Sequence, residues 1–151
     1  MKKIASLLYL LLVMISVTSC AEDDYYDSGE DDIIYALTSV RWLNSYMVVL
    51  PDGSMAEDYS IWNFDPDGRG YWTTGVEYED GYYEEDTYYF RWGFTNPTCS
   101  VIYMNIQVYG DCYWLIDTLS PDWLGIWQAP FDPVMNPGID RTYYSFEAIQ
   151  K

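Results

Sequence analysis

The chain has 151 residues, with 24 Asp and Glu against 7 Lys and Arg, no His, and a formal net charge of −17. Such an excess of carboxylates repels a phosphate backbone, so we expect no nucleic-acid partner. Without His the chain also lacks Ser/His/Asp and Cys/His catalytic arrangements and most kinds of zinc site.

Residues 1–19 have the layout of a secretion signal. Lys2 and Lys3 precede an apolar run from Ile4 to Val17, and this run is shorter than the roughly 20 residues that a membrane-spanning helix needs. The run ends in Val17-Thr18-Ser19-Cys20, which resembles the lipobox of bacterial lipoproteins, where the cysteine receives diacylglycerol. The resemblance implies a mature chain that starts at Cys20 and is held on the outer membrane by its lipid, at the surface or on the periplasmic face. The alternative is an ordinary secretory peptide followed by a stray cysteine.

An acidic tract, residues 20–32, follows. It holds seven carboxylates between Glu22 and Asp32, a density that disfavours packing into a core and predicts a solvated tether. A run of this kind after a lipidated cysteine resembles a signal for export to the outer face of the outer membrane. We therefore expect a signal peptide over 1–19, a tether over 20–32, and over 33–151 one domain of about 120 residues with a single core.

The domain is predicted to be all-β. Aromatic residues make up 19% of the chain, and Val, Ile and Thr recur in short runs, a composition that favours strands. A short helix is expected from Asp32 to Leu37. Turn signals such as Asp65-Pro66-Asp67-Gly68 then arrive at close intervals. Between them we expect eight strands, near residues 41–50, 60–64, 69–78, 87–94, 100–107, 113–119, 123–128 and 141–148.

Alternation along these segments indicates that each strand buries one face. Tyr88, Phe90, Trp92 and Phe94 share one face of their strand, and polar or small residues occupy the other. Eight successive strands with short connections close naturally into an antiparallel up-and-down barrel, which leaves no sheet edge unpaired.

Four segments in this order resemble a known family: Trp42, residues 64–70, Phe90-Arg91-Trp92 and residues 116–124. They are similar to the small lipocalin-like lipoproteins of Gram-negative bacteria, within the calycin group of eight-stranded barrels. The resemblance covers about residues 37–148 and implies a lipocalin-like barrel. It also implies a structural pair at the closed end, where Trp42 packs under Arg141 from the last strand. The chain departs from the family at Val40, where a Gly is usual, and in Arg141, which precedes the final tyrosines.

The two remaining cysteines, Cys99 and Cys112, are expected to be free and buried. An oxidising compartment usually favours a disulfide. In a hairpin that turns near Tyr109, however, Cys112 would lie opposite residue 107 and Cys99 opposite residue 120. The thiols would then be roughly 25 Å apart along the strands, far beyond the ~7 Å limit for bonded Cα atoms.

Neither metal binding nor catalysis is predicted. Asp65-Pro66-Asp67-Gly68 and the acidic residues between Glu77 and Asp86 offer oxygen ligands for a hard cation. The first lacks the closing Glu of a calcium loop, so we interpret the two as a turn and a solvated loop. A glycoside hydrolase needs two facing carboxylates; Asp117 and Glu147 come closest, and we expect no enzyme and no cofactor.

The aromatic residues suggest a ligand site. Seven Trp and many Tyr exceed what a core of this size requires, and a small barrel has room for one ligand among its rings. If the barrel is hollow, we expect Tyr88, Trp92 and Trp127 to line it; otherwise the rings simply fill it. Two functions stay open: a binding protein for a small hydrophobic or glycan-like molecule, or a structural lipoprotein that docks a cell-envelope partner.

Overall fold

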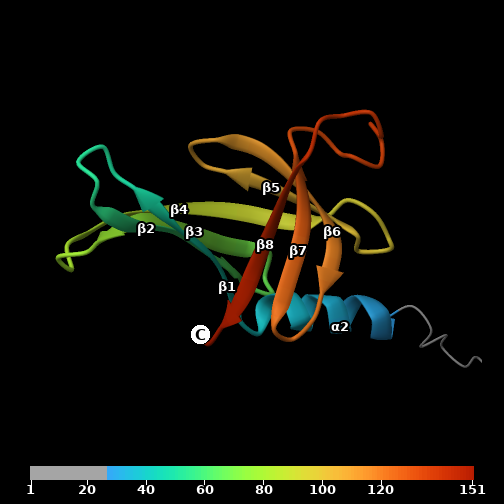
Figure 1. Cartoon of the computed structure of the whole chain (residues 1–151). Helices are drawn as coiled ribbons and strands as arrows, with labels where there is room; N and C mark the ends of the chain where they lie inside the picture. Colours follow the sequence, from blue (N-terminus) through green and yellow to red (C-terminus); the bar gives the residue numbers. More distant parts are fainter. Residues whose placement is uncertain (1–26) are drawn as a thin grey trace, which may run out of the picture.

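A computed structural model describes residues 27–151 and shows a closed, eight-stranded antiparallel barrel in which each strand pairs with the next and β8 returns to β1 (Figure 1). The all-β up-and-down barrel with one N-terminal helix is thereby confirmed. The predicted signal peptide and Cys20 lie outside the described residues. The elements are α2 (Asp27–Thr38), β1 (Arg41–Val49), β2 (Met55–Phe64), β3 (Arg69–Tyr78), β4 (Tyr83–Phe94), β5 (Val101–Ile106), β6 (Gly110–Leu119), β7 (Trp123–Ala129) and β8 (Thr142–Ile149).

Helix α2 begins at Asp27, five residues before the predicted start at Asp32, so the second half of the predicted tether is helical. Carboxylates in the first turns of a helix interact favourably with its positive N-terminal end, which explains why an acidic segment adopts this structure. Glu30, Asp31 and Asp32 are exposed, as expected of solvated residues. Among residues 27–151 no helix is long and apolar enough to cross a membrane.

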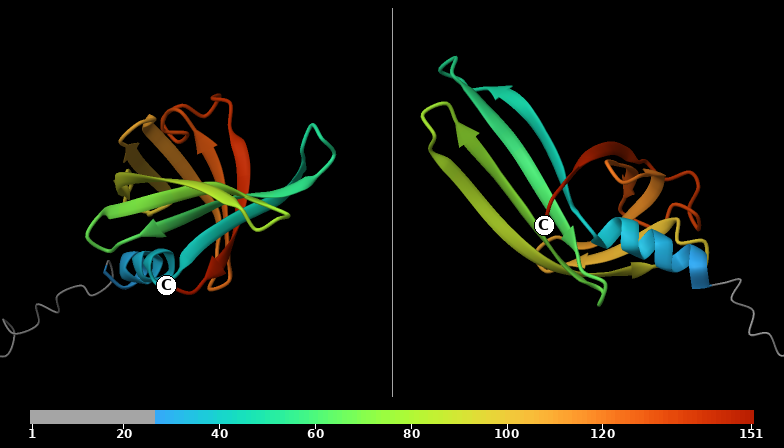
Figure 2. Two further views of the ribbon diagram at one scale, coloured as in Figure 1. Left: turned by 90° about the vertical axis from the view of Figure 1, so that its left-hand side faces the viewer. Right: turned by 90° about the horizontal axis from the view of Figure 1, so that it is seen from below.

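The C-terminal turn of α2 closes one end of the barrel. Leu37 is fully buried, and its carbonyl oxygen accepts a hydrogen bond of 2.9 Å from Nε1 of Trp42, which is also fully buried. Thr38 donates its hydroxyl proton to the carbonyl of Ile34 at 2.7 Å, which ties down the last turn. Figure 2 shows the helix lying across this end, which we call the closed end.

Strands β2 and β4 begin four to five residues earlier than predicted, at Met55 and Tyr83. The acidic segment at the start of β4 was predicted to be a loop, and this is wrong. In the structure Tyr83 pairs with Glu77 and Glu85 pairs with Gly75, so the strand continues through the carboxylates. Pairing with β3 overrides the low strand propensity of Glu and Asp.

The first four strands extend beyond the barrel wall. All of β1 pairs with β2, but only Arg41–Leu43 pairs with β8. Likewise β4 pairs with β3 over most of its length but with β5 only from Phe90 to Phe94. The outer halves of β1 to β4 therefore form a sheet that projects past the other strands, as Figure 2 shows in its right-hand view.

The closed half of the barrel is filled with apolar side chains. Phe64 packs edge-on against Phe90 and Trp92, with ring centroids 5.4 and 5.5 Å apart. The predicted alternation is confirmed in β4, where Phe90 is buried and Tyr89 is exposed. Burial of each large side chain contributes roughly 1.5–3 kcal/mol, so this half carries much of the stability. Fully buried side chains include Ile102, Met104, Trp114, Leu124 and Ile126.

Both described cysteines are free, as predicted, although Cys112 is only partly buried. The predicted hairpin register is wrong, because Cys112 pairs with Met104 instead of residue 107. Ile106 pairs with Gly110, so the turn spans three residues, and Gly110 directly after it has a φ of 79°. A glycine adopts this left-handed conformation without strain.

Candidate ligand cavity

A cavity of about 680 Å³ occupies the end of the barrel remote from α2. Its wall comes from the inner faces of the strands, together with the segment that leads into β8. This volume lies within the range of small-molecule sites, roughly 300–1,000 Å³. The barrel is thus solid at one end and hollow at the other.

Three tryptophans form the floor of the cavity. Trp62 on β2 lies flat against Trp72 on β3, with ring centroids 4.9 Å apart and planes within 8°. Trp114 on β6 meets Trp62 edge-on at 4.6 Å. The indole N–H of Trp72 is buried and has no hydrogen-bond partner within the described part of the chain. The floor therefore presents mainly aromatic surface to the cavity.

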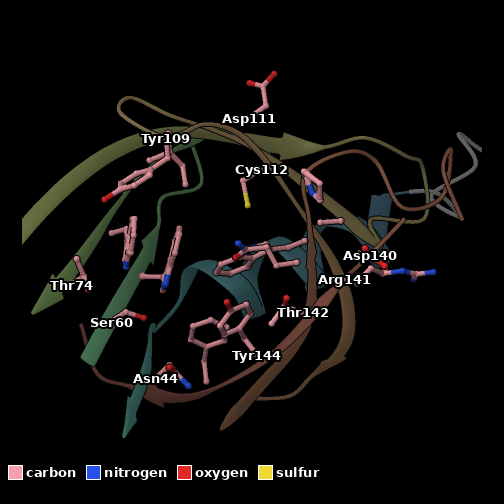
Figure 3. A pocket seen from close by; sticks show the side chains of 18 of the residues that line it. Asn44, Ser60, Thr74, Tyr109, Asp111, Cys112, Asp140, Arg141, Thr142 and Tyr144 are labelled. Atoms are coloured by element: carbon pink, nitrogen blue, oxygen red, sulfur yellow. The ribbon is translucent and has the colours of Figure 1, made fainter. Parts of the chain in front are cut away.

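A layer of small polar side chains lies above the tryptophans. Asn44, Ser60 and Thr74 pair across β1, β2 and β3, each two residues from the aromatic layer and so on the same face. Asn44 donates to the carbonyl of Ser145 at 2.9 Å, and this bond fixes its amide. Figure 3 shows the three side chains together along one wall. Their oxygens are suited to orienting a polar group.

Acidic and tyrosyl side chains surround the mouth. Asp58 pairs with Tyr46 one layer above Ser60, and burial, followed by the charge of Asp58, raises the pKa of Tyr46. Asp140 and Arg141 stand at another side of the mouth, where Arg141 donates to the carbonyl of Pro137 at 3.1 Å.

Asp111 lies at the rim and faces outward (Figure 3). It accepts hydrogen bonds of 2.8 Å from Asn105 and from the hydroxyl of Tyr103. These bonds lower the pKa of Asp111, with Asn105 contributing most. Asp111 is therefore held ionised at the rim.

None of the three residues predicted to bind a ligand lies on the cavity wall. Tyr88 packs behind it, against the rings of Trp72 and Tyr109, each 5.3 Å away. Trp92 lies at the filled end, where its N–H donates to the carbonyl of Arg69 at 2.9 Å. Trp127 is on the outer face beside Tyr143, because the register of β7 turns its neighbour Ile126 inward.

The predicted pairing of Trp42 with Arg141 is also wrong. Trp42 pairs with Ala148 near the end of β8, whereas Arg141 precedes the start of that strand. Seven strand residues, roughly 23 Å, separate the two positions. Trp42 keeps the structural role expected of it through burial and its bond to Leu37, while Arg141 belongs to the mouth.

The alternation of side chains along the sequence could have identified some of the cavity residues that the prediction missed. Asp58, Ser60 and Trp62 alternate with Tyr59 and Ile61 as one face of a strand should. The predicted strand began only at residue 60, so Asp58 was left out. Trp72 and Trp114 carried no local signal that distinguished a cavity floor from a filled core.

No protein-family model matches the chain, and no curated protein is significantly similar to it. The lipocalin-like resemblance beyond the barrel fold therefore stays a hypothesis. Within residues 27–151 no three Cys, Asp or Glu side chains are grouped so as to hold a metal ion. Asp117 and Glu147, the nearest candidates for a hydrolase pair, are both exposed and lie off the cavity wall.

Proposed function

We propose that this protein is a non-enzymatic binding lipoprotein, anchored to the outer membrane through Cys20, that takes a small molecule into the hollow end of its barrel. The observation that carries the proposal is the cavity of about 680 Å³ with an aromatic floor and a polar wall. An apolar ring of the ligand packs against Trp62 and Trp72, and a polar group meets Ser60 and its neighbours. A hydrophobic or glycan-like molecule with a ring fits this description.

The arrangement favours binding because it exists before the ligand arrives. The floor rings pack on one another, and Trp114 donates to Oε1 of Gln128 at 3.1 Å. Side chains that are already ordered lose little conformational entropy when a ligand binds.

A second function, docking of a cell-envelope protein, is favoured by a different observation. The projecting sheet exposes apolar side chains near its free ends, among them Met47, Val49 and Tyr83, each more than half exposed. Exposed apolar groups of this kind are typical of interaction surfaces. The projecting sheet does not depend on the cavity, so the two functions make separate predictions.

Filling the cavity tests the proposed binding function. We expect the neutral fluorescent probe N-phenyl-1-naphthylamine to bind the full chain, and Ser60→Trp to weaken binding by about tenfold or more because the new ring occupies the cavity. Fluorescence titration measures both affinities. Ser45→Trp, at an exposed position on the same strand as Asn44, is the matched control and should bind as the wild type does. Equal affinities in all three proteins would show that the cavity is not the binding site.

A further inference from the structure

The inner face of the projecting sheet is layered in a way that distinguishes its two ends chemically. The lowest layer is aromatic, with Trp62 and Trp72 as cross-strand partners, and the part of the next layer that lies on β1 to β3 is neutral and polar. Asp58 lies two residues before Ser60 on β2, in the next layer toward the mouth. Its neighbours in that layer are Tyr46 and Val76. On β4, the same face carries Asp86 and then Glu84, which pairs with Val76. Carboxylates therefore increase toward the mouth.

The balance of charge at the mouth is negative. Two carboxylates, Asp58 and Asp140, and one cation, Arg141, line the mouth, and a third carboxylate, Asp111, lies at the rim and faces outward. Arg141 follows Asp140 directly and donates to a backbone carbonyl. The whole chain carries a formal charge of −17, and a mouth lined with one sign of charge concentrates ligands of the opposite sign and repels those of its own. An anionic ligand is thus disfavoured.

The distance from the aromatic floor to Asp58 sets the length of a ligand that can contact both. Asp58 lies four residues from Trp62 along β2, roughly 13 Å between Cα atoms, with Ser60 between them. The side chains of Asp58 and Trp62 both extend into the cavity and shorten this distance. A ligand with a ring at one end and an ammonium group a few bonds away spans the space between them. Asp58 is only half-buried, so the ammonium keeps part of its hydration.

Resting on the proposed binding function, we infer that the ligand is an arylalkylamine that is protonated at neutral pH, with its aromatic ring packed against Trp62 and Trp72 and its ammonium group against the Asp58 carboxylate. Uncharged rings enter the same site more weakly, and carboxylated rings more weakly still. The protein is on this basis selective for charge as well as for shape.

The test uses three probes that share an indole ring and differ in charge: tryptamine, the neutral alcohol tryptophol and the indole-3-acetate anion. Each is titrated calorimetrically into the full chain in an uncharged detergent, with the heat of dilution into detergent alone subtracted. We expect tryptamine to bind about tenfold more tightly than tryptophol, because only tryptamine carries an ammonium group that can pair with the Asp58 carboxylate. Indole-3-acetate should bind least.

Asp58→Asn should lower the affinity for tryptamine to that for tryptophol and leave tryptophol unchanged. Asp122→Asn is the matched control, because it removes an equal charge from an exposed turn at the closed end. It should leave the preference for tryptamine over tryptophol unchanged. If Asp58→Asn does not fold, the salt dependence of the wild type provides a second measurement. Added salt should weaken tryptamine binding and leave tryptophol binding unchanged.

The outcomes separate this inference from the binding function on which it rests. Equal affinities for tryptamine and tryptophol, or binding of the naphthylamine probe without any binding of tryptamine, would overturn the inference and leave the binding function standing. Failure of every probe, the naphthylamine included, would overturn both.

Discussion

Cys112 shows how burial alters the chemistry of a single residue on the cavity wall. Desolvation raises the pKa of its thiol to about 11, and the thiolate is the form that reacts with alkylating agents. We expect iodoacetamide to modify Cys112 slowly at pH 8 and progressively faster as the pH approaches 11. Mass spectrometry of the peptide that contains residue 112 measures the rate.

The same peptide from urea-unfolded protein is the control and should react at pH 8 as an ordinary thiol does. Because the folded pKa lies above the unfolded one, the contribution of Cys112 to stability is complete below the unfolded value and is lost as the pH rises through about 11. Equal rates in folded and unfolded protein at pH 8 would show that the thiol is not desolvated.

At the scale of elements, α2 acts as the plug of the closed end through one side chain. Leu37 is fully buried beneath the barrel, and its carbonyl holds Trp42. We expect Leu37→Ala to lower the free energy of unfolding by about 2–5 kcal/mol, since the cavity it leaves is enclosed by helix and strands. Urea denaturation followed by tryptophan fluorescence measures the change.

Tyr35→Ala is the matched control within the same helix. Tyr35 is 74% exposed, so its removal should change the free energy of unfolding by no more than about 0.5 kcal/mol. If both substitutions have the same small effect, the helix does not contribute to the stability of the barrel.

For the whole molecule, the proposed anchor predicts where the protein resides in the cell. Cys20→Ala removes the acyl acceptor, and two or more acyl chains are what stable anchoring requires. In a Gram-negative host the wild-type chain should sediment with outer membranes, and the variant should not. Immunoblots of the fractions measure the distribution, with Cys99→Ala as a control that keeps the anchor. Sedimentation of both variants with membranes would contradict lipid anchoring.

Much of the fold could be predicted from local pattern. Asp65-Pro66-Asp67-Gly68 and the other turn signals placed the hairpins, and the alternation of Phe90 with Tyr89 and Arg91 identified the inner face of β4. The predicted ends of the strands were wrong where pairing with a neighbouring strand determines how far a strand extends. The acidic start of β4 is a strand only because β3 lies beside it, and β2 extends back to Met55 for the same reason.

The sequence by itself determined which face of β4 points inward, because side chains alternate with a period of two residues whatever the surroundings. Only the tertiary structure decided how deep each ring lies. Trp62 and Trp92 both point inward, yet one forms the floor of a cavity and the other fills the closed end. Depth depends on the register between strands, and register is set by pairing with residues distant in the chain.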